Sequence, residues 1–208
     1  NSTMCNLDLR KVNDREVEGS FSSTNRFWGG PKEVKVFFIL QFDRPFGSLD
    51  GWKGKDLLKN ISMLKCDRAG ISAKYRLRPG DLLQIKVSIS YTSIENARNN
   101  LLTECTTWDF DAVRSETRRI WNEWLGKIDV KGGTDADRIK FYTDLWHVLL
   151  GRQKINDVSG DYPDRTTGIR DGSFTNAVFK VKQVPKLENG QLKYNMYSSD
   201  AFWLTQWN

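Results

Sequence analysis

The sequence has 208 residues, with 38% hydrophobic and 28% charged residues, 8 tryptophans and a net charge of +6. This composition is typical of a globular chain that is large enough for one domain, or for one domain and part of another. It excludes a helical membrane span, because no segment approaches the ~18 apolar residues that such a span requires.

The positive charge is spread along the chain, because lysine and arginine alternate with acidic residues and no five basic residues follow one another. This pattern indicates a solvated surface rather than a nucleic-acid or membrane surface, and we expect neither partner. Cys5, Cys66 and Cys105 are an odd number without CxxC spacing, which argues against a zinc cluster and a disulfide scaffold. We expect three buried thiols, with one disulfide as the alternative.

The N-terminal region is predicted to form strands. Residues 1–20 predict an edge strand and a second short strand, and residues 21–31 predict a loop that ends in Gly-Gly-Pro. Arg26 and Trp28 in this loop have the chemistry of a sugar-binding site, because an indole offers a flat face to a pyranose ring and a guanidinium donates hydrogen bonds. The alternative is that Trp28 plugs the edge of a β-sandwich.

Residues 33–42 are the clearest early strand, with apolar side chains on both faces, as expected of an internal strand in a thick sandwich. Residues 43–46 close this strand, since a proline cannot donate to a central ladder. Glycines around Trp52 predict loops, and weaker strands are expected over 57–64 and 71–77. Strands at this spacing are typical of a sandwich.

The last predicted strand of this region covers residues 82–90 and has a two-residue period. Its odd positions are apolar and its even positions are polar from Gln84 onward, so the odd face is expected to be the buried one. These apolar positions are Leu83, Ile85, Val87 and Ile89.

Three helices are expected to follow Tyr91, each with an apolar stripe at helical spacing. Their predicted N-caps are Thr92, Asp109 and Thr134, and a carboxylate stands three residues after both threonines, as in a capping box. The second and third helices are expected to end at Gly126 and Gly151.

The chain after these helices contains an oxygen-rich loop at 156–165, which invites a calcium interpretation. The loop lacks the spacing of an EF-hand, so a turn-rich loop is the preferred interpretation. Residues 174–184 and 191–197 are predicted to form a hairpin across Asn189-Gly190. His147 is the single histidine, which rules out a multi-histidine metal site, and we interpret it as a packed rather than a catalytic residue.

Four stretches, at 87–97, 108–113, 121–128 and 141–150, resemble glycoside hydrolase family 92, the calcium-dependent exo-α-mannosidases, in the same order and at similar spacing. The resemblance implies an antiparallel β-sandwich, a helical linker and an (α/α) barrel that holds the active site. It also implies that the 208 residues are the N-terminal portion of a much longer polypeptide.

The domain boundaries that follow from this resemblance are a sandwich over 1–91, incomplete at its N-terminus, a linker over 92–133, and the beginning of the catalytic barrel over 134–208. A barrel that is cut after its first helix leaves large apolar side chains without partners, and we expect these to be covered by the remainder of the polypeptide. The affected residues are Leu145, Trp146, Leu149, Phe202 and Trp207.

The last segment, 197–208, resembles the family motif Ser-x-Trp-Asp-Thr-Phe-Arg. Asp200 matches the aspartate that binds hydroxyls of the non-reducing mannose, and Phe202 matches the aromatic residue. Ser199 replaces the motif's tryptophan and Trp203 replaces its arginine, which removes a fixed hydrogen-bond fork and offers a stacking face instead. Asp200 can also cap the next barrel helix, and the two roles are compatible.

The resemblance therefore implies a parent enzyme that hydrolyses terminal α-mannosides of glycans with inversion, with calcium as cofactor, in a bacterial periplasm or outside the cell. No residue of this sequence matches the family's catalytic acid, base or calcium ligands, so we assign none here and expect the 208 residues alone to be inactive. The substrate-binding candidates are Trp28, Asp200 and Trp203. The alternative function is a non-catalytic carbohydrate-binding sandwich.

Overall fold

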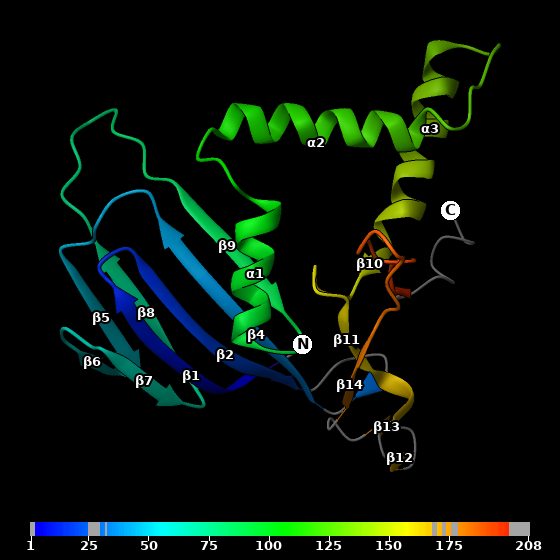
Figure 1. The fold of residues 1–208 in the computed structure, drawn as a ribbon. Helices are drawn as coiled ribbons and strands as arrows, with labels where there is room; N and C mark the ends of the chain where they lie inside the picture. Colours follow the sequence, from blue (N-terminus) through cyan, green and yellow to red (C-terminus); the bar gives the residue numbers. More distant parts are fainter. Residues whose placement is uncertain are drawn as a thin grey trace. The chain divides into compact units, whose positions relative to one another are not determined.

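The computed structural model describes residues 3–24, 30–31, 33–167, 170–171, 174–175 and 179–199. The chain divides into two compact units, and each is described by itself. The first unit comprises Asn1–Thr106 and Asn156–Tyr194, and the second comprises Thr107–Ile155 and Asn195–Asn208. As predicted, antiparallel strands come first and helices follow (Figure 1).

The main sheet of the first unit has five strands in the order β7-β1-β2-β4-β9, and its neighbours pair antiparallel. The prediction for residues 1–20 was wrong in one respect, because β1 and β2 are long and lie inside the sheet rather than at its edge. The predicted loop is also shorter, since β2 extends to Thr24. The strands are β1 (Thr3–Asn13), β2 (Glu16–Thr24), β4 (Glu33–Phe42), β7 (Met63–Cys66) and β9 (Ile85–Ser90).

A second sheet has the order β6-β5-β8, and the hydrophobic core lies between the two sheets. The core includes Leu9 and Val17 of the main sheet and Leu49 of the second. Trp52 lies in a strand and not in the predicted loop region, because β5 pairs on both sides through this stretch. The strands are β5 (Ser48–Lys53), β6 (Asp56–Leu58) and β8 (Ala69–Lys74).

Strand β4 is internal, as predicted, and buries side chains on both faces. Phe38 and Phe42 belong to the core between the sheets, while Ile39 belongs to a second core against helix α1 (Ile94–Glu104). Figure 1 shows α1 lying across β4 and β9. Ala97 and Leu101 of the helix pack on Ile39.

Strand β9 has the opposite burial from the prediction. Its apolar residues Ile85, Val87 and Ile89 are exposed, whereas Lys86 and Ser90 are buried. The polar face lies under α1, where the Lys86 ammonium donates to the Cys105 carbonyl over 2.7 Å. The apolar face lies on the same side of the main sheet as the core, but the second sheet does not cover it.

Several short strands complete the first unit. β3 (Gly30–Pro31) pairs in parallel with β13 (Phe174–Thr175), and β13 pairs with β12 (Arg170–Asp171). β11 (Asp161–Asp164) pairs with β14 (Lys180–Gln183), and a 3-10 turn covers Arg165–Thr167. The predicted long hairpin of 174–184 with 191–197 is therefore wrong. Its central turn does form, because the Leu187 amide donates to the Gln191 carbonyl and Gly190 has a φ of +81°.

The second unit contains helices α2 (Phe110–Leu125) and α3 (Asp135–Leu150), followed by β10 (Arg152–Lys154) paired with β15 (Tyr197–Ser199). The predicted caps of both helices are correct: Asp109 accepts from the Ala112 amide, and Thr134 forms a capping box with Asp137. Among the described residues, no helix has the length and apolar character that a membrane crossing needs.

Candidate functional site

The three predicted substrate-binding residues, Trp28, Asp200 and Trp203, lie outside the described residues, and their predicted roles stay predictions. The structure does describe the backbone that leads to each segment. These anchoring elements, and the polar contacts that hold them, make up the part of the candidate site that the structure shows.

The described residues on either side of the Trp28 segment are paired with other strands. β2 ends at Thr24 in register with Glu33 of β4, and β3 begins at Gly30 opposite Phe174 of β13. Phe174 and Thr175 are thereby paired with Gly30 and Pro31, although these positions are about 140 residues apart in the sequence.

The residues that precede Asp200 are paired with the chain that leaves α3. Ser199, which stands at the motif's tryptophan position, pairs with Arg152 in the two-stranded sheet of β10 and β15. The Ile155 amide also donates to the Met196 carbonyl over 2.9 Å. Asp200 therefore directly follows a residue whose backbone is positioned by the exit from α3.

A buried polar cluster attaches the loop 156–161 to the junction between β9 and α1. We call it the Asp157 cluster. Asp157 is 3% exposed and accepts from the Asn100 amide over 2.7 Å and from the Ser90 hydroxyl over 2.9 Å, as well as from the Thr92 hydroxyl. These three hydrogen bonds offset the desolvation free energy of a carboxylate that is buried away from water. Its members are Ser90, Thr92, Asn96, Asn100, Asp157 and Asp161.

The cluster holds the loop by its backbone as well. The side-chain oxygen of Asn100 accepts a hydrogen bond from the Val158 backbone amide over 2.9 Å. The side-chain amide of Asn96 donates to the Asp161 carboxylate over 2.9 Å. Gly160 has a φ of +95°, which lets the loop turn tightly between these two contacts. The loop 156–161 is therefore tied to the same strand-to-helix junction that carries the first stretch of the family resemblance.

The N-cap of α1 explains why the sequence did not reveal this cluster. Thr92 was predicted to cap the helix, but the cap is Ser93, whose hydroxyl accepts from the Asn96 amide over 3.0 Å. Thr92 instead turns to Asp157, which is 65 residues away in the sequence. Two adjacent hydroxyl residues have equal capping chemistry, so only the distant partner decides between them.

The oxygen-rich loop does not fit a calcium ion. Donor groups already occupy its carboxylates: Asn96 and Gln183 donate to Asp161, and Thr166 and Lys182 hold Asp164. The Lys182 ammonium and the Thr166 hydrogen bonds lower the pKa of Asp164 to about 2. Within the described part of the chain, no group of three His, Cys, Asp or Glu side chains could hold a metal.

A second polar network joins α1 to the sheet. The Arg98 guanidinium lies 2.6 Å from Glu16 and 2.6 Å from Glu18, both of which are buried on β2. Arg10 also donates to Glu18 over 2.8 Å, and Gln41 donates to Glu16 over 2.8 Å. Burial by itself would raise the pKa of Glu16, but the hydrogen bonds from Arg98 and Gln41 outweigh it and hold this pKa below its ordinary value.

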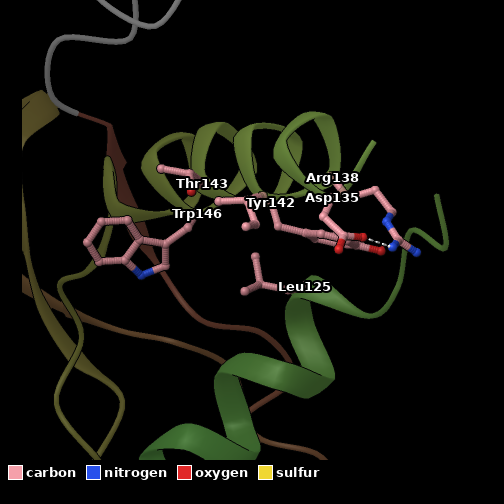
Figure 2. A pocket seen from close by; sticks show the side chains of 7 residues that line it. Leu125, Asp135, Arg138, Tyr142, Thr143 and Trp146 are labelled. Atoms are coloured by element: carbon pink, nitrogen blue, oxygen red, sulfur yellow. Dashed lines mark hydrogen bonds and ion pairs between the residues drawn. The ribbon is translucent and has the colours of Figure 1, made fainter. Parts of the chain in front are cut away.

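Helices α2 and α3 contribute open apolar surface rather than a closed site. None of their residues is buried. Residues of both helices line a groove of about 680 Å³. In Figure 2, Trp146 and Tyr142 of α3 lie on the side of Leu125 of α2, and the Asp135–Arg138 ion pair lies at one end. The described residues that line a second hollow of about 540 Å³ are aromatic or aliphatic, namely Ile120, Trp121, Trp124, Leu149 and Tyr197.

This agrees with the expectation that the barrel residues lack partners here. Trp146 is exposed, while Leu145 and Leu149 are half-buried; Phe202 and Trp207 lie outside the described residues. His147 is exposed, so the prediction of a packed histidine is wrong; its ring lies 5.1 Å from that of the adjacent Trp146. All three cysteines are free and half-buried, not fully buried as expected.

Comparisons with known proteins agree with this geometry. The family model described as the glycosyl hydrolase family 92 catalytic domain matches residues 96–208. No curated protein matches the chain in sequence. The match to solved structures covers nearly the whole of this chain. The chain spans only about a quarter of the length of those structures.

Three of these structures illustrate the match. The inverting mannosidase BT2199 from Bacteroides thetaiotaomicron VPI-5482 has a TM-score of 0.70 and 21% identity, with 96% of this chain and 25% of that chain covered. The family hydrolase ccman5 has a TM-score of 0.73 and 22% identity, with 97% and 24% covered. The α-mannosidase BT3965 from B. thetaiotaomicron, in complex with mannoimidazole, has a TM-score of 0.64 and 19% identity, with 93% and 23% covered. At these identities the likeness shows the fold.

Proposed function

The chain belongs to glycosyl hydrolase family 92, and on this basis we propose that its full-length polypeptide hydrolyses terminal α-mannosides of glycans with inversion of the anomeric centre. The observation that carries the proposal is the match of residues 96–208 to the family's catalytic domain. Solved structures described as an inverting mannosidase and as an α-mannosidase with mannoimidazole support the choice of substrate.

In this proposal the 208 residues supply the supporting sandwich, the linker helices and the opening of the catalytic barrel. Trp28, Asp200 and Trp203 bind the substrate. The paired backbone of β3 and β13 supports this role for the Trp28 segment, and the pairing of β10 with β15 supports it for Asp200. The Asp157 cluster contributes indirectly, because it ties down the loop that leads to β12 and β13.

The chemistry itself belongs to residues outside the described part of the chain. An inverting glycosidase needs a carboxylic acid that protonates the leaving group and a carboxylate that activates water, about 6.5–9.5 Å apart. We propose that the full-length polypeptide also requires calcium, whose ligands lie in that other part. The loop 156–165 is not proposed as the calcium site, because its carboxylates are occupied by protein donors.

The test is hydrolysis of an aryl α-mannoside by the full-length polypeptide, with and without a calcium chelator, while NMR identifies the first anomer released. We expect activity that the chelator abolishes and added calcium restores, with β-mannose as the first product. Residues 1–208 alone serve as the inactive control. Release of α-mannose first, or no cleavage of any α-mannoside by a folded full-length protein, contradicts the proposal.

The altered motif permits a sharper test of specificity. We expect Trp203→Arg to raise kcat/KM for the α-mannoside relative to other aryl α-glycosides, because it restores the planar donor fork of the family motif. Trp28→Ala is expected to raise KM more than it lowers kcat if Trp28 contacts the bound sugar. If Trp28 instead plugs the sandwich, the substitution lowers the melting temperature and leaves KM unchanged.

We further propose that the protein works in a bacterial periplasm or outside the cell, where glycan substrates are accessible, and that its essential partner is the remainder of its own polypeptide. Fractionation of the native host, followed by detection of the full-length protein, tests the location. Recovery in the cytoplasmic fraction contradicts it.

A further inference from the structure

The apolar row of β9, formed by Ile85, Val87 and Ile89, is exposed although its sequence pattern is that of a buried face. Ile85, Val87 and Ile89 are 52%, 60% and 47% exposed. They stand opposite Phe42, Leu40 and Phe38 of β4 in the antiparallel register, and therefore share a face with them. Phe38 and Phe42 are buried in the core between the sheets, so the row continues the core surface one strand further.

The edge of β9 is also unprotected. β9 is the last strand of the order β7-β1-β2-β4-β9, and no other described strand pairs with its outer edge. Natural edge strands are usually guarded by an outward lysine, a proline or a bulge. β9 has no proline, its six pairs with β4 follow without a register shift, and Lys86 points to the opposite face, where it is buried against the C-terminal end of α1.

The second sheet explains why the row is open. It has only three strands, β6, β5 and β8, and the core that it covers includes residues of β1, β2, β4 and β7 but none of β9. The main sheet is thus one strand wider than the layer that faces it. A strand with alternating apolar residues is the element that fits such a gap, because it would present one apolar face to the row.

The length of the matched structures indicates where this strand comes from. The chain spans 24–25% of two of them, so most of a family-length polypeptide lies outside residues 1–208. No residue of α2 or α3 is buried either, which fits a chain whose remaining packing partners lie outside residues 1–208.

We infer that β9 is an internal strand of a wider sandwich, and that a β-strand of the same polypeptide, outside residues 1–208, covers Ile85, Val87 and Ile89. This strand completes the sandwich and shields the row from self-association. The inference rests on the family's chain length and not on the proposed activity, so an inactive but folded full-length protein would leave it standing.

The experiment compares Val87→Asp with Leu57→Asp in the full-length polypeptide. Leu57 on β6 is the matched control, because it is equally apolar and 74% exposed. We expect Val87→Asp to lower the melting temperature by more than ~5 °C, because it buries an unpaired charge, and Leu57→Asp to change it by less than ~2 °C. In residues 1–208 alone, both substitutions should have similarly small effects.

A second measurement covers the case in which Val87→Asp prevents folding. Val87→Cys should react slowly with a maleimide in the full-length protein and quickly in residues 1–208, each compared with the labelling of its own parent protein without the added cysteine. Equal, fast labelling in both lengths overturns the inference. So does a full-length protein that forms a dimer which Val87→Asp dissociates, because the row would then face a second copy.

Discussion

Helices α1 and α2 have similar sequence features but opposite environments. Each has a side-chain cap at its N-terminus and an apolar stripe. α1 buries Ala97, Asn100 and Leu101 against the main sheet, whereas no residue of α2 is buried. An apolar stripe thus shows which face of a helix can be buried, and the presence of a packing partner decides whether it is.

The same contrast separates the two units. The first unit has two hydrophobic cores, and its buried Glu16 and Glu18 are paired with Arg98 of α1. In the second, ring contacts such as Trp121 on Trp146, at 6.2 Å, hold two helices that remain open on their other faces. We therefore expect substitutions in the first unit to change the stability of this chain far more than matched substitutions in the second.

The largest expected effect is that of Leu101→Ala in α1. Leu101 is almost completely buried against Ile39, and truncation of such a residue costs about 2–5 kcal/mol of unfolding free energy. Leu102→Ala, at the exposed neighbouring position, should cost less than about 1 kcal/mol. Urea unfolding followed by tryptophan fluorescence measures both, and equal effects would show that α1 does not pack as described.

Next in size is the effect of Arg98→Ala. It leaves Glu16 without its cationic partner and Glu18 with Arg10 alone, so we expect a loss of about 3 kcal/mol. The control is Arg119→Ala in α2, which removes exposed pairs with two glutamates and should cost about 0.5 kcal/mol. A loss for Arg98→Ala as small as that for Arg119→Ala would mean that the network adds nothing to the attachment of α1.

A smaller effect is expected from Asp157→Asn. The amide keeps the size of the side chain but removes an acceptor from buried donors, which costs about 1–3 kcal/mol. Hydrogen exchange should accelerate over residues 158–164, where the loop is tied to Asn100. Asp144→Asn in α3 is the exposed control and should leave that exchange unchanged.

Capping substitutions should cost the same in both units. Ser93→Ala and Thr134→Ala each remove a hydroxyl that accepts from a backbone amide, and each should cost about 1 kcal/mol of helix stability. Circular dichroism measured on each variant during thermal unfolding provides the comparison. A much larger loss for Ser93→Ala would show that the cap also supports the tertiary packing of α1.

The smallest effect concerns acidification. The Lys74 hydrogen bond lowers the pKa of Asp50 from 3.8 to about 2, and the Lys182 hydrogen bond does the same for Asp164. Because the folded-state values are depressed, this stabilisation is present above pH ~4 and is lost as the pH falls toward ~2. The lysines are more than half exposed, so solvent screening keeps the effect small. Lys74→Met should make the acid limb of the unfolding free energy shallower.

Local chemistry made several elements predictable. The caps of α2 and α3 and their glycine ends were correct, because the contacts involved lie within four residues of each other. The bounds of β4 followed from its apolar run and the proline after it. The turn at Gly190 was also predictable, since the left-handed conformation there favours glycine.

Long-range pairing was not predictable in the same way. The residues 174–184 and 191–197 pair with β11, β3 and β10 rather than with each other, and nothing in the segments themselves identifies those partners. The same holds for Asp157, whose role depends on hydroxyl and amide groups that lie 57–67 residues earlier. The family resemblance pointed to this junction but not to the cluster that holds it.

The sequence by itself determined the class of the fold, the helices with their caps, and membership of a family whose motifs it carries in order. Only the tertiary structure decided which faces are buried, because burial depends on what lies opposite. Strand β9 illustrates the difference: its period predicted a buried apolar face, but the sheet places its polar face under α1 and leaves the apolar row without a covering layer.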